Sequence, residues 1–126
     1  MNILLAEDDS DCQRLLRDLL ADRPEITLTC ATNGAEAWWH LSDPESRFNL
    51  VITDVNMPSV SGLQLLQRMR RTSRLQHVPV IVCSGLKDRQ VVQDAVSLDA
   101  AHYVLKPYLP QAMRSKIDKI LLGAKC

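Results

Sequence analysis

Leu50-Val51-Ile52-Thr53-Asp54 is the stretch that decides the fold. Four largely apolar residues run without a charged break and then end on a carboxylate, which is the pattern of a strand covered on both faces. Four other short segments carry similar apolar runs, and segments with helical spacing separate them. The five predicted strands are residues 3–6, 26–31, 50–53, 79–83 and 103–105. This alternation predicts an α/β fold with a doubly wound parallel sheet and helices on both sides.

Helix-start signals mark each of the five amphipathic segments. Two are capping boxes, one is an asparagine cap, one is an aspartate, and one is a proline suited to a first helical turn. These signals are Ser10 with Gln13, Asn33 with Glu36, Ser61 with Gln64, Asp88, and Pro110. We therefore expect five helices, one after each strand.

The chain has 126 residues, 46% of them hydrophobic, which predicts one domain over residues 1–126 with its own core. Fifteen basic residues balance fifteen acidic ones, so no net field attracts nucleic acid or an anionic membrane. No apolar run approaches the ~20 residues of a membrane span, and the short one at the start is not a signal peptide. The four cysteines have no metal-ligand spacing and are expected to be reduced. A cytoplasmic protein is therefore expected.

Polar side chains stand where four of the five predicted strands end: Asp8 with Asp9, Asp54, Ser84 and Lys106. Ligands of an open parallel sheet bind outside the carboxyl ends of its strands, so these groups converge if the first and third strands are neighbours. Carboxylates that meet repel one another and need cations, which Lys106 and an oxygen-ligated Mg²⁺ would supply. A carboxylate, a divalent metal, a hydroxyl and a lysine together predict a phosphoryl-transfer site.

The chain resembles the response-regulator receiver domains of two-component signalling over essentially its whole length. The motifs that carry the resemblance are residues 7–9, residues 54–58 with Gly62, residues 84–85 and residues 103–107. The resemblance implies a flavodoxin-like, three-layer sandwich with strand order 2-1-3-4-5. It implies a phosphorylation-controlled signalling module and not an enzyme, although such a domain assists its own phosphorylation and dephosphorylation.

The resemblance also implies roles for the acidic residues. Asp54 would accept the phosphoryl group from a sensor histidine kinase or a phosphotransfer protein. Asp9 and Asp54 would hold Mg²⁺ directly, with the backbone carbonyl of Asn56, and Asp8 would act through water.

Four further residues take roles by the same resemblance. Lys106 would pair with the phosphoryl oxygens, and Pro107 would follow a cis peptide bond. Ser84 and Tyr103 would form a switch that reshapes the face built from the fourth helix, the fifth strand and the fifth helix. A downstream protein would bind that face, and neither nucleic acid nor a membrane would be a direct partner. The resemblance also allows a homodimer that forms on phosphorylation.

Some residues depart from the family pattern or have no role in it. Asp99 stands where the family usually has a glycine, and we expect it to take a left-handed conformation. Leu86 cannot orient an attacking water, so we expect a long-lived phosphorylated state. Trp38 is expected to pack inward, with Trp39 half exposed. The cluster Arg68, Arg70, Arg71 and Arg74 is predicted to be a solvated helix end.

Two other functions fit parts of the sequence. A Mg²⁺-dependent phosphatase with an aspartyl nucleophile has a similar topology, but it needs a second Asp two residues after the nucleophile, where this chain has Asn56. A scaffold that has lost phosphorylation is disfavoured because the set Asp8, Asp9, Asp54, Ser84 and Lys106 is complete.

Overall fold

Five parallel strands form a single sheet in the order β2-β1-β3-β4-β5. The computed structural model describes residues 1–55, 57, 60–85, 89–106 and 109–122. The strands are β1 (Asn2–Ala6), β2 (Thr27–Ala31), β3 (Leu50–Asp54), β4 (Val80–Ser84) and β5 (His102–Leu105). β3 is central and buried along its whole length, as the unbroken apolar run of residues 50–53 predicts. The predicted strand order and all five strands are confirmed.

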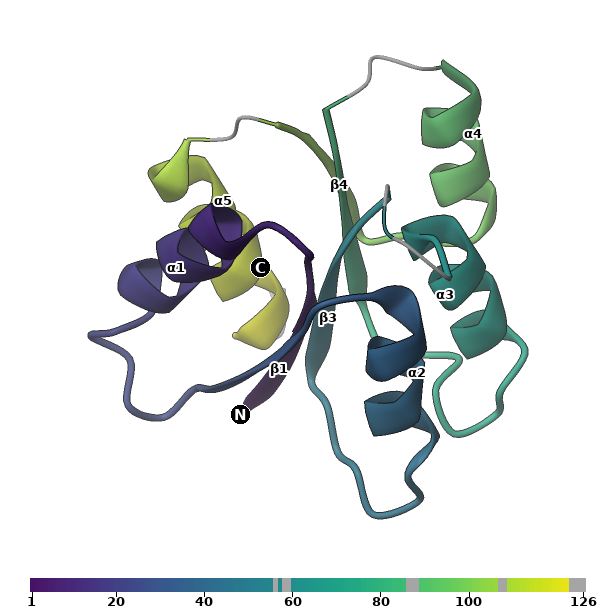
Figure 1. The fold of residues 1–126 in the computed structure, drawn as a ribbon, viewed down its shortest axis with the longest axis horizontal. Helices are drawn as coiled ribbons and strands as arrows, with labels where there is room; N and C mark the ends of the chain where they lie inside the picture. Colours follow the sequence, from purple (N-terminus) through teal and green to yellow (C-terminus); the bar gives the residue numbers. More distant parts are fainter. Residues whose placement is uncertain (56, 58–59, 86–88, 107–108, 123–126) are drawn as a thin grey trace.

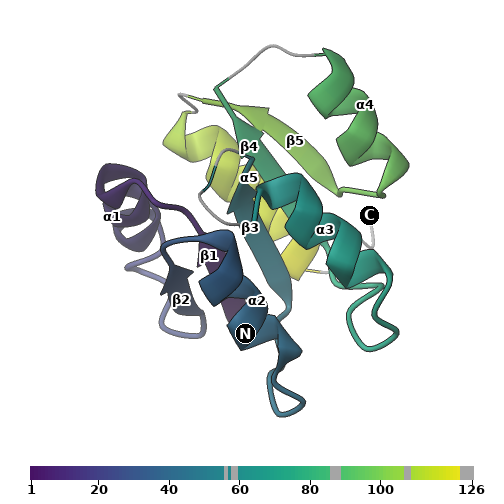
Figure 2. The same ribbon diagram turned by 45° about the vertical axis from the view of Figure 1, so that its right-hand side comes forward.

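The helices are α1 (Ser10–Leu19), α2 (Gly34–Ser42), α3 (Gly62–Arg70), α4 (Arg89–Ser97) and α5 (Pro110–Leu121). Helices α1 and α5 cover one face of the sheet, and α2, α3 and α4 cover the other (Figures 1 and 2). The result is the predicted three-layer sandwich, in which every connection between neighbouring parallel strands crosses through a helix.

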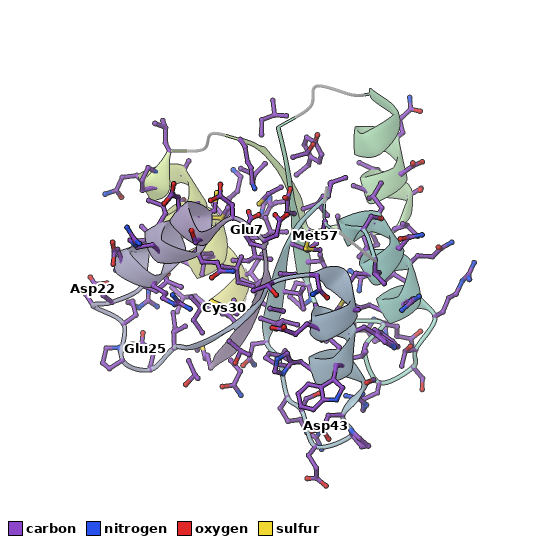
Figure 3. All side chains as sticks on the ribbon, in the orientation of Figure 1. Glu7, Asp22, Glu25, Cys30, Asp43 and Met57 are labelled. Atoms are coloured by element: carbon purple, nitrogen blue, oxygen red, sulfur yellow. The ribbon has the colours of Figure 1, made fainter. Side chains whose placement is uncertain are left out.

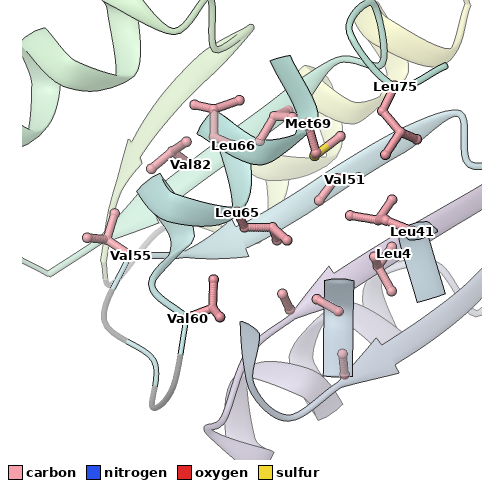
Figure 4. Packing of buried hydrophobic residues seen from close by; sticks show 14 of the residues in the cluster. Leu4, Leu41, Val51, Val55, Val60, Leu65, Leu66, Met69, Leu75 and Val82 are labelled. Carbon is pink, nitrogen blue, oxygen red and sulfur yellow. The ribbon is translucent and has the colours of Figure 1, made fainter. Parts of the chain in front are cut away.

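Each face of the sheet has its own hydrophobic core. On the α2–α4 face, Leu65, Leu66 and Met69 of α3 pack against Val51 and its neighbours in the sheet (Figure 4). On the α1/α5 face, Leu16 of α1 and Ile117 of α5 pack against the opposite side chains of the same strands. Because successive strand residues point to opposite faces, a continuous apolar strand supplies both cores.

The caps of the described helices follow the sequence with one exception. Ser61 and Gln64 form the predicted capping box, and Asn33 caps α2 by accepting a hydrogen bond from the Glu36 N–H. At α1, however, Asp9 is the N-cap and accepts from the Asp11 N–H at 2.9 Å, so the prediction of a Ser10 capping box is wrong. The predicted start of the fourth helix at Asp88 lies outside the described residues.

Several smaller expectations are also resolved. Asp99 has φ 61°, the left-handed conformation expected of it. Trp39 is 70% exposed, whereas Trp38 packs partly against the core. Cys12, Cys30 and Cys83 are free thiols, and burial raises the pKa of Cys83 to about 12. No helix among the described residues is long and apolar enough to cross a membrane.

Candidate functional site

A group of three carboxylates lies at the carboxyl end of the sheet. Glu7 directly follows β1, and Asp54 is the last residue of the neighbouring β3. One carboxylate oxygen from each of Glu7, Asp8 and Asp54 lies within 4.8 Å of the others. Glu7 and Asp54 are buried and Asp8 is exposed. Figure 3 shows Glu7 close to the N-terminal end of α1. We call Glu7, Asp8 and Asp54 the carboxylate group.

Lys106, which follows β5, provides a cation for this group. Its Nζ forms an ion pair with Glu7 Oε1 and lies 3.4 Å from Asp54 Oδ2. Burial by itself lowers the pKa of Lys106, but the hydrogen bond and charge of Glu7, with the charge of Asp54, raise it overall. Lys106 is therefore a permanent cation that partly offsets the repulsion between the carboxylates.

Glu7 is the most constrained member of the carboxylate group. Burial raises its pKa, and the charge of Asp54 adds to the increase, while the Lys106 hydrogen bond opposes it. Burial and a nearby like charge both penalise the ionised form of a carboxyl group. A further cation bound at the group would relieve that penalty.

Asp9 does not belong to the carboxylate group. Its side chain turns toward α1, where it accepts from the Asp11 N–H and lies 3.6 Å from Cys12 Sγ. The Asp11 hydrogen bond holds the pKa of Asp9 below its ordinary value. The structure therefore brings together Glu7, Asp8 and Asp54, whereas the sequence predicts Asp8, Asp9 and Asp54. Glu7 is the member of the carboxylate group that the sequence does not predict, although its position as the first polar residue after β1 indicates a place at the edge of the sheet.

Ser84 and Tyr103 stand on the neighbouring strands β4 and β5. Ser84 is fully buried at the end of β4, one residue beyond Cys83, which is the register partner of Asp54. Tyr103 is partly buried, packs against the core of the α2–α4 face, and is paired with Val82 across the sheet. Three other predicted residues, Asn56, Leu86 and Pro107, lie outside the described residues.

Gly62 fixes the approach of α3 to the site. A Cβ atom at this position would lie 2.2 Å from the backbone oxygen of Asp54, closer than real Cβ contacts allow. The Gly62 N–H also donates to the carbonyl of Val55 at 3.0 Å. Only glycine lets the start of α3 pack this closely against the end of β3.

The donor set of the carboxylate group suits a small, hard divalent cation. It offers only carboxylate oxygens as ligands, and two of the three carboxylates are buried. Mg²⁺ prefers oxygen ligands and keeps bound waters that a phosphate oxygen can replace. A lysine and a buried hydroxyl at adjacent strand ends complete the groups needed to stabilise a transferring phosphoryl group.

Comparison with known proteins identifies the class. The chain matches the response regulator receiver domain family over residues 3–118 and belongs to that family. Members of this family are signalling domains of two-component systems, not classical enzymes, and their general role is to accept a phosphoryl group.

Individual relatives agree with this assignment. The chemotaxis protein CheY of Pseudomonas aeruginosa is 32% identical over 120 residues, which cover 95% of this chain and 95% of that protein. The 3′,5′-cyclic-nucleotide phosphodiesterase regA of Dictyostelium discoideum is 32% identical over 119 residues, 94% of this chain but only 15% of that protein. The solved Mn²⁺-bound form of response regulator Rcp1 shares the fold, with a TM-score of 0.85 and 23% identity over 99% of this chain and 96% of that one.

Proposed function

We propose that Asp54 accepts a phosphoryl group from a phosphohistidine of a sensor histidine kinase or a phosphotransfer protein, in the cytoplasm and with Mg²⁺. In this step the P–N bond of the phosphohistidine breaks and a P–O bond to an Asp54 carboxylate oxygen forms. The histidine nitrogen keeps the electron pair and takes up a proton. The observation that carries the proposal is the buried Asp54 at the end of the central strand, beside Lys106 and two further carboxylates.

The proposed metal ligands differ from the sequence expectation in two ways, because Glu7 takes the place of Asp9 and Asp8 binds directly rather than through water. Asp8 and Asp54 would hold Mg²⁺ directly, and Glu7 would add a buried carboxylate to the ligand set. The backbone carbonyl of Asn56 is retained as a ligand from the family resemblance. Asp9 is left out because its carboxylate caps α1. When bound, the cation would neutralise charge on the phosphoryl oxygens.

Lys106 and Ser84 would act on the phosphoryl group itself. Lys106 already lies between Glu7 and Asp54, so it would pair with a phosphoryl oxygen without a long movement. The Ser84 hydroxyl would donate to a second oxygen, and Tyr103 on the adjacent strand would respond to that change. Preorganised donors of this kind stabilise developing charge.

A target protein would bind the face of α4, β5 and α5. Large apolar side chains are exposed there: Val96 is 69% exposed, Leu105 40% and Leu109 74%. Exposed apolar residues gathered on one face are typical of a contact surface. We also propose that a second copy of the chain binds this face, so that a homodimer forms on phosphorylation.

The test of the proposed function is labelling by acetyl phosphate, followed by intact-mass spectrometry. We expect one phosphoryl group on the unsubstituted protein in Mg²⁺, none on Asp54→Asn, and none with excess EDTA. Asp22→Asn, a surface carboxylate remote from the site, is the matched control and is expected to be labelled normally. Labelling of Asp54→Asn at the unsubstituted level would show that another residue is the acceptor.

The same samples separate this function from the aspartyl-phosphatase alternative. A receiver domain forms a stoichiometric phosphoprotein, whereas a phosphatase turns over a small phosphomonoester many times. Sustained hydrolysis of p-nitrophenyl phosphate that Asp54→Asn abolishes would overturn the signalling role.

A further inference from the structure

We infer that Gln13 is a positioning residue for the carboxylate group, because its side chain fixes the peptide bond that joins Glu7 to Asp8. Gln13 lies in α1 and is only 9% exposed. Its amide Nε2 donates to the backbone carbonyl of Glu7 at 2.6 Å. The sequence predicts that Gln13 completes a capping box with Ser10. Its side chain instead reaches back to the turn that carries Glu7 and Asp8.

This hydrogen bond controls the direction of two carboxylates at once. The Glu7 carbonyl belongs to the same planar peptide group as the Asp8 N–H, so fixing the carbonyl fixes that plane. On its other side Glu7 is held by β2, because the Glu7 N–H donates to the Ala31 carbonyl at 2.9 Å. With both sides held, the Cα–Cβ bonds of Glu7 and Asp8 have set directions toward Asp54.

Asp8 depends on this arrangement more than Glu7 does. Glu7 has a side-chain ion pair with Lys106 that also orients it. Within the described part of the chain, no side-chain hydrogen bond or ion pair holds the exposed Asp8. Its carboxylate is therefore placed by the backbone, which is held on one side of Asp8 by Gln13 and on the other by the Asp9 N–H, which donates to Glu7 Oε2 at 3.4 Å.

The burial of Gln13 argues against a role as simple filler. Moving an amide out of water costs free energy unless it finds a partner, so an apolar side chain would fill the same space at lower cost. The Gln13 backbone N–H also donates to the Asp9 carbonyl at 3.1 Å, which ties the first turn of α1 to the same β1–α1 turn. Gln13 thus connects the helix to the β1–α1 turn through both its main chain and its side chain, and the side chain is the part that reaches Glu7.

The inference rests on the proposed Mg²⁺ site, and its test measures Mg²⁺ binding with no phosphodonor present. Gln13→Met keeps the length and helix propensity of the side chain and removes the N–H donor. We expect the Mg²⁺ dissociation constant from isothermal titration calorimetry to rise about tenfold, as for other losses of a group that orients metal ligands. Gln13→Asn, whose shorter amide does not reach the carbonyl, is a second variant with the same expected direction.

Two control variants separate positioning from loss of stability. Gln67→Met replaces an exposed glutamine of α3 and is expected to leave Mg²⁺ binding unchanged. Ile117→Val removes a methylene from the α1/α5 core and is expected to lower the free energy of unfolding without changing Mg²⁺ binding.

The outcomes are distinct. If both Gln13 variants bind Mg²⁺ as tightly as the unsubstituted protein, Gln13 has no positioning role although the metal site stands. If Ile117→Val weakens binding as much as Gln13→Met does, the effect is general destabilisation, and the inference is overturned. If the unsubstituted protein does not bind Mg²⁺, the proposed metal site is wrong and the inference is lost with it.

Discussion

The two faces of the sheet attach their helices by different chemistry. On the α1/α5 face, the arginines pair mainly with carboxylates: Arg114 pairs with Asp22 at 2.9 Å, and Arg23 pairs with Asp118 at 2.5 Å. Both pairs join the segment after α1 to helix α5. In the first pair the arginine lies in α5, and in the second the carboxylate does. Arg114 also donates to the Leu19 carbonyl at 3.1 Å. On the α2–α4 face, the Arg70 side chain donates hydrogen bonds only to backbone carbonyls among the described residues.

Arg70 donates four hydrogen bonds from the end of α3. Its acceptors are the carbonyls of Leu98 and Asp99 after α4, at 2.9 and 3.0 Å, and those of Val78 and Gln76 before β4, at 2.9 and 3.2 Å. Arg74 similarly donates to the Leu41 carbonyl at the end of α2, at 2.6 Å. The α2–α4 face is therefore held by side-chain to main-chain bonds that no acid can titrate and that salt screens weakly.

Arginine therefore has two different uses in this fold: it pairs with carboxylates on one face and satisfies main-chain carbonyls on the other. An exposed arginine–carboxylate pair contributes little and depends on salt and pH. A part-buried guanidinium that satisfies several carbonyls leaves those groups without a partner when it is removed. Four predictions test this difference, in decreasing order of the change in stability.

The largest effect is expected for Arg70→Met. Loss of four charge-assisted hydrogen bonds should lower the free energy of unfolding by about 3 kcal/mol, measured by urea denaturation. Arg71→Met is the matched control, since Arg71 is exposed and its side chain has no hydrogen bond among the described residues. It should change stability by less than about 0.5 kcal/mol. Equal losses in the two variants would show that the Arg70 bonds are not stabilising.

The next effect concerns Asp99, whose carbonyl accepts from Arg70 and whose φ is 61°. Glycine adopts this conformation without a steric cost, whereas alanine does not and also lacks the polar side chain that helps aspartate there. Asp99→Gly should be more stable than Asp99→Ala by about 1 kcal/mol in the same urea assay. A more stable alanine variant would contradict the strained backbone at the end of α4.

Salt should separate the two faces. Arg114→Met should destabilise the protein less than Arg70→Met, and its effect should shrink as NaCl is raised toward about 1 M. The loss in Arg70→Met should persist over most of the same range because the four atoms that accept its hydrogen bonds are neutral carbonyl oxygens, although the nearby Asp99 carboxylate adds a small salt-dependent attraction. The comparison fails if both losses respond to salt in the same way.

The smallest effect is a pH dependence confined to the α1/α5 face. The Arg114 hydrogen bond holds the pKa of Asp22 below its ordinary value of 3.8, and the Arg23 hydrogen bond holds that of Glu25 below 4.5. Carboxylates with a lowered folded-state pKa stabilise the protein above those ordinary values, and this stabilisation disappears as pH falls through the folded-state pKa. The destabilisation caused by Arg114→Met should therefore shrink in acid to the part that comes from its bond to the neutral Leu19 carbonyl, whereas that caused by Arg70→Met should remain nearly unchanged. Urea denaturation of both variants between about pH 7 and 3 checks this.

The elements that the sequence predicts well are those set by local pattern. The apolar runs gave all five strands because burial on both faces leaves an unbroken hydrophobic signature. The Ser61–Gln64 box and the Asn33 cap were predicted correctly because their partners lie within one helical turn. The Asp8, Asp54 and Lys106 positions followed from the strand ends in the same way.

The failures lie where a long-range contact decided between local alternatives. The arginine cluster was predicted as a solvated helix end, which holds for the exposed Arg68 and Arg71 but is wrong for Arg70. Its acceptors at Leu98 and Asp99 lie 28 and 29 residues away along the chain. No local pattern reports a partner at that separation.

Local sequence is enough to predict the α/β alternation and the acidic residues, hydroxyl and lysine at the strand ends, since each depends on neighbours within a few residues. Long-range packing selects the two of the three consecutive acids at residues 7–9, Glu7 and Asp8, that lie beside Asp54. That choice depends on the Glu7 N–H bonded to Ala31, the Glu7 carbonyl bonded to Gln13, and the Lys106 ion pair. Because β2, α1 and β5 supply these contacts, the direction of Glu7 exists only once those elements have packed around the end of β1.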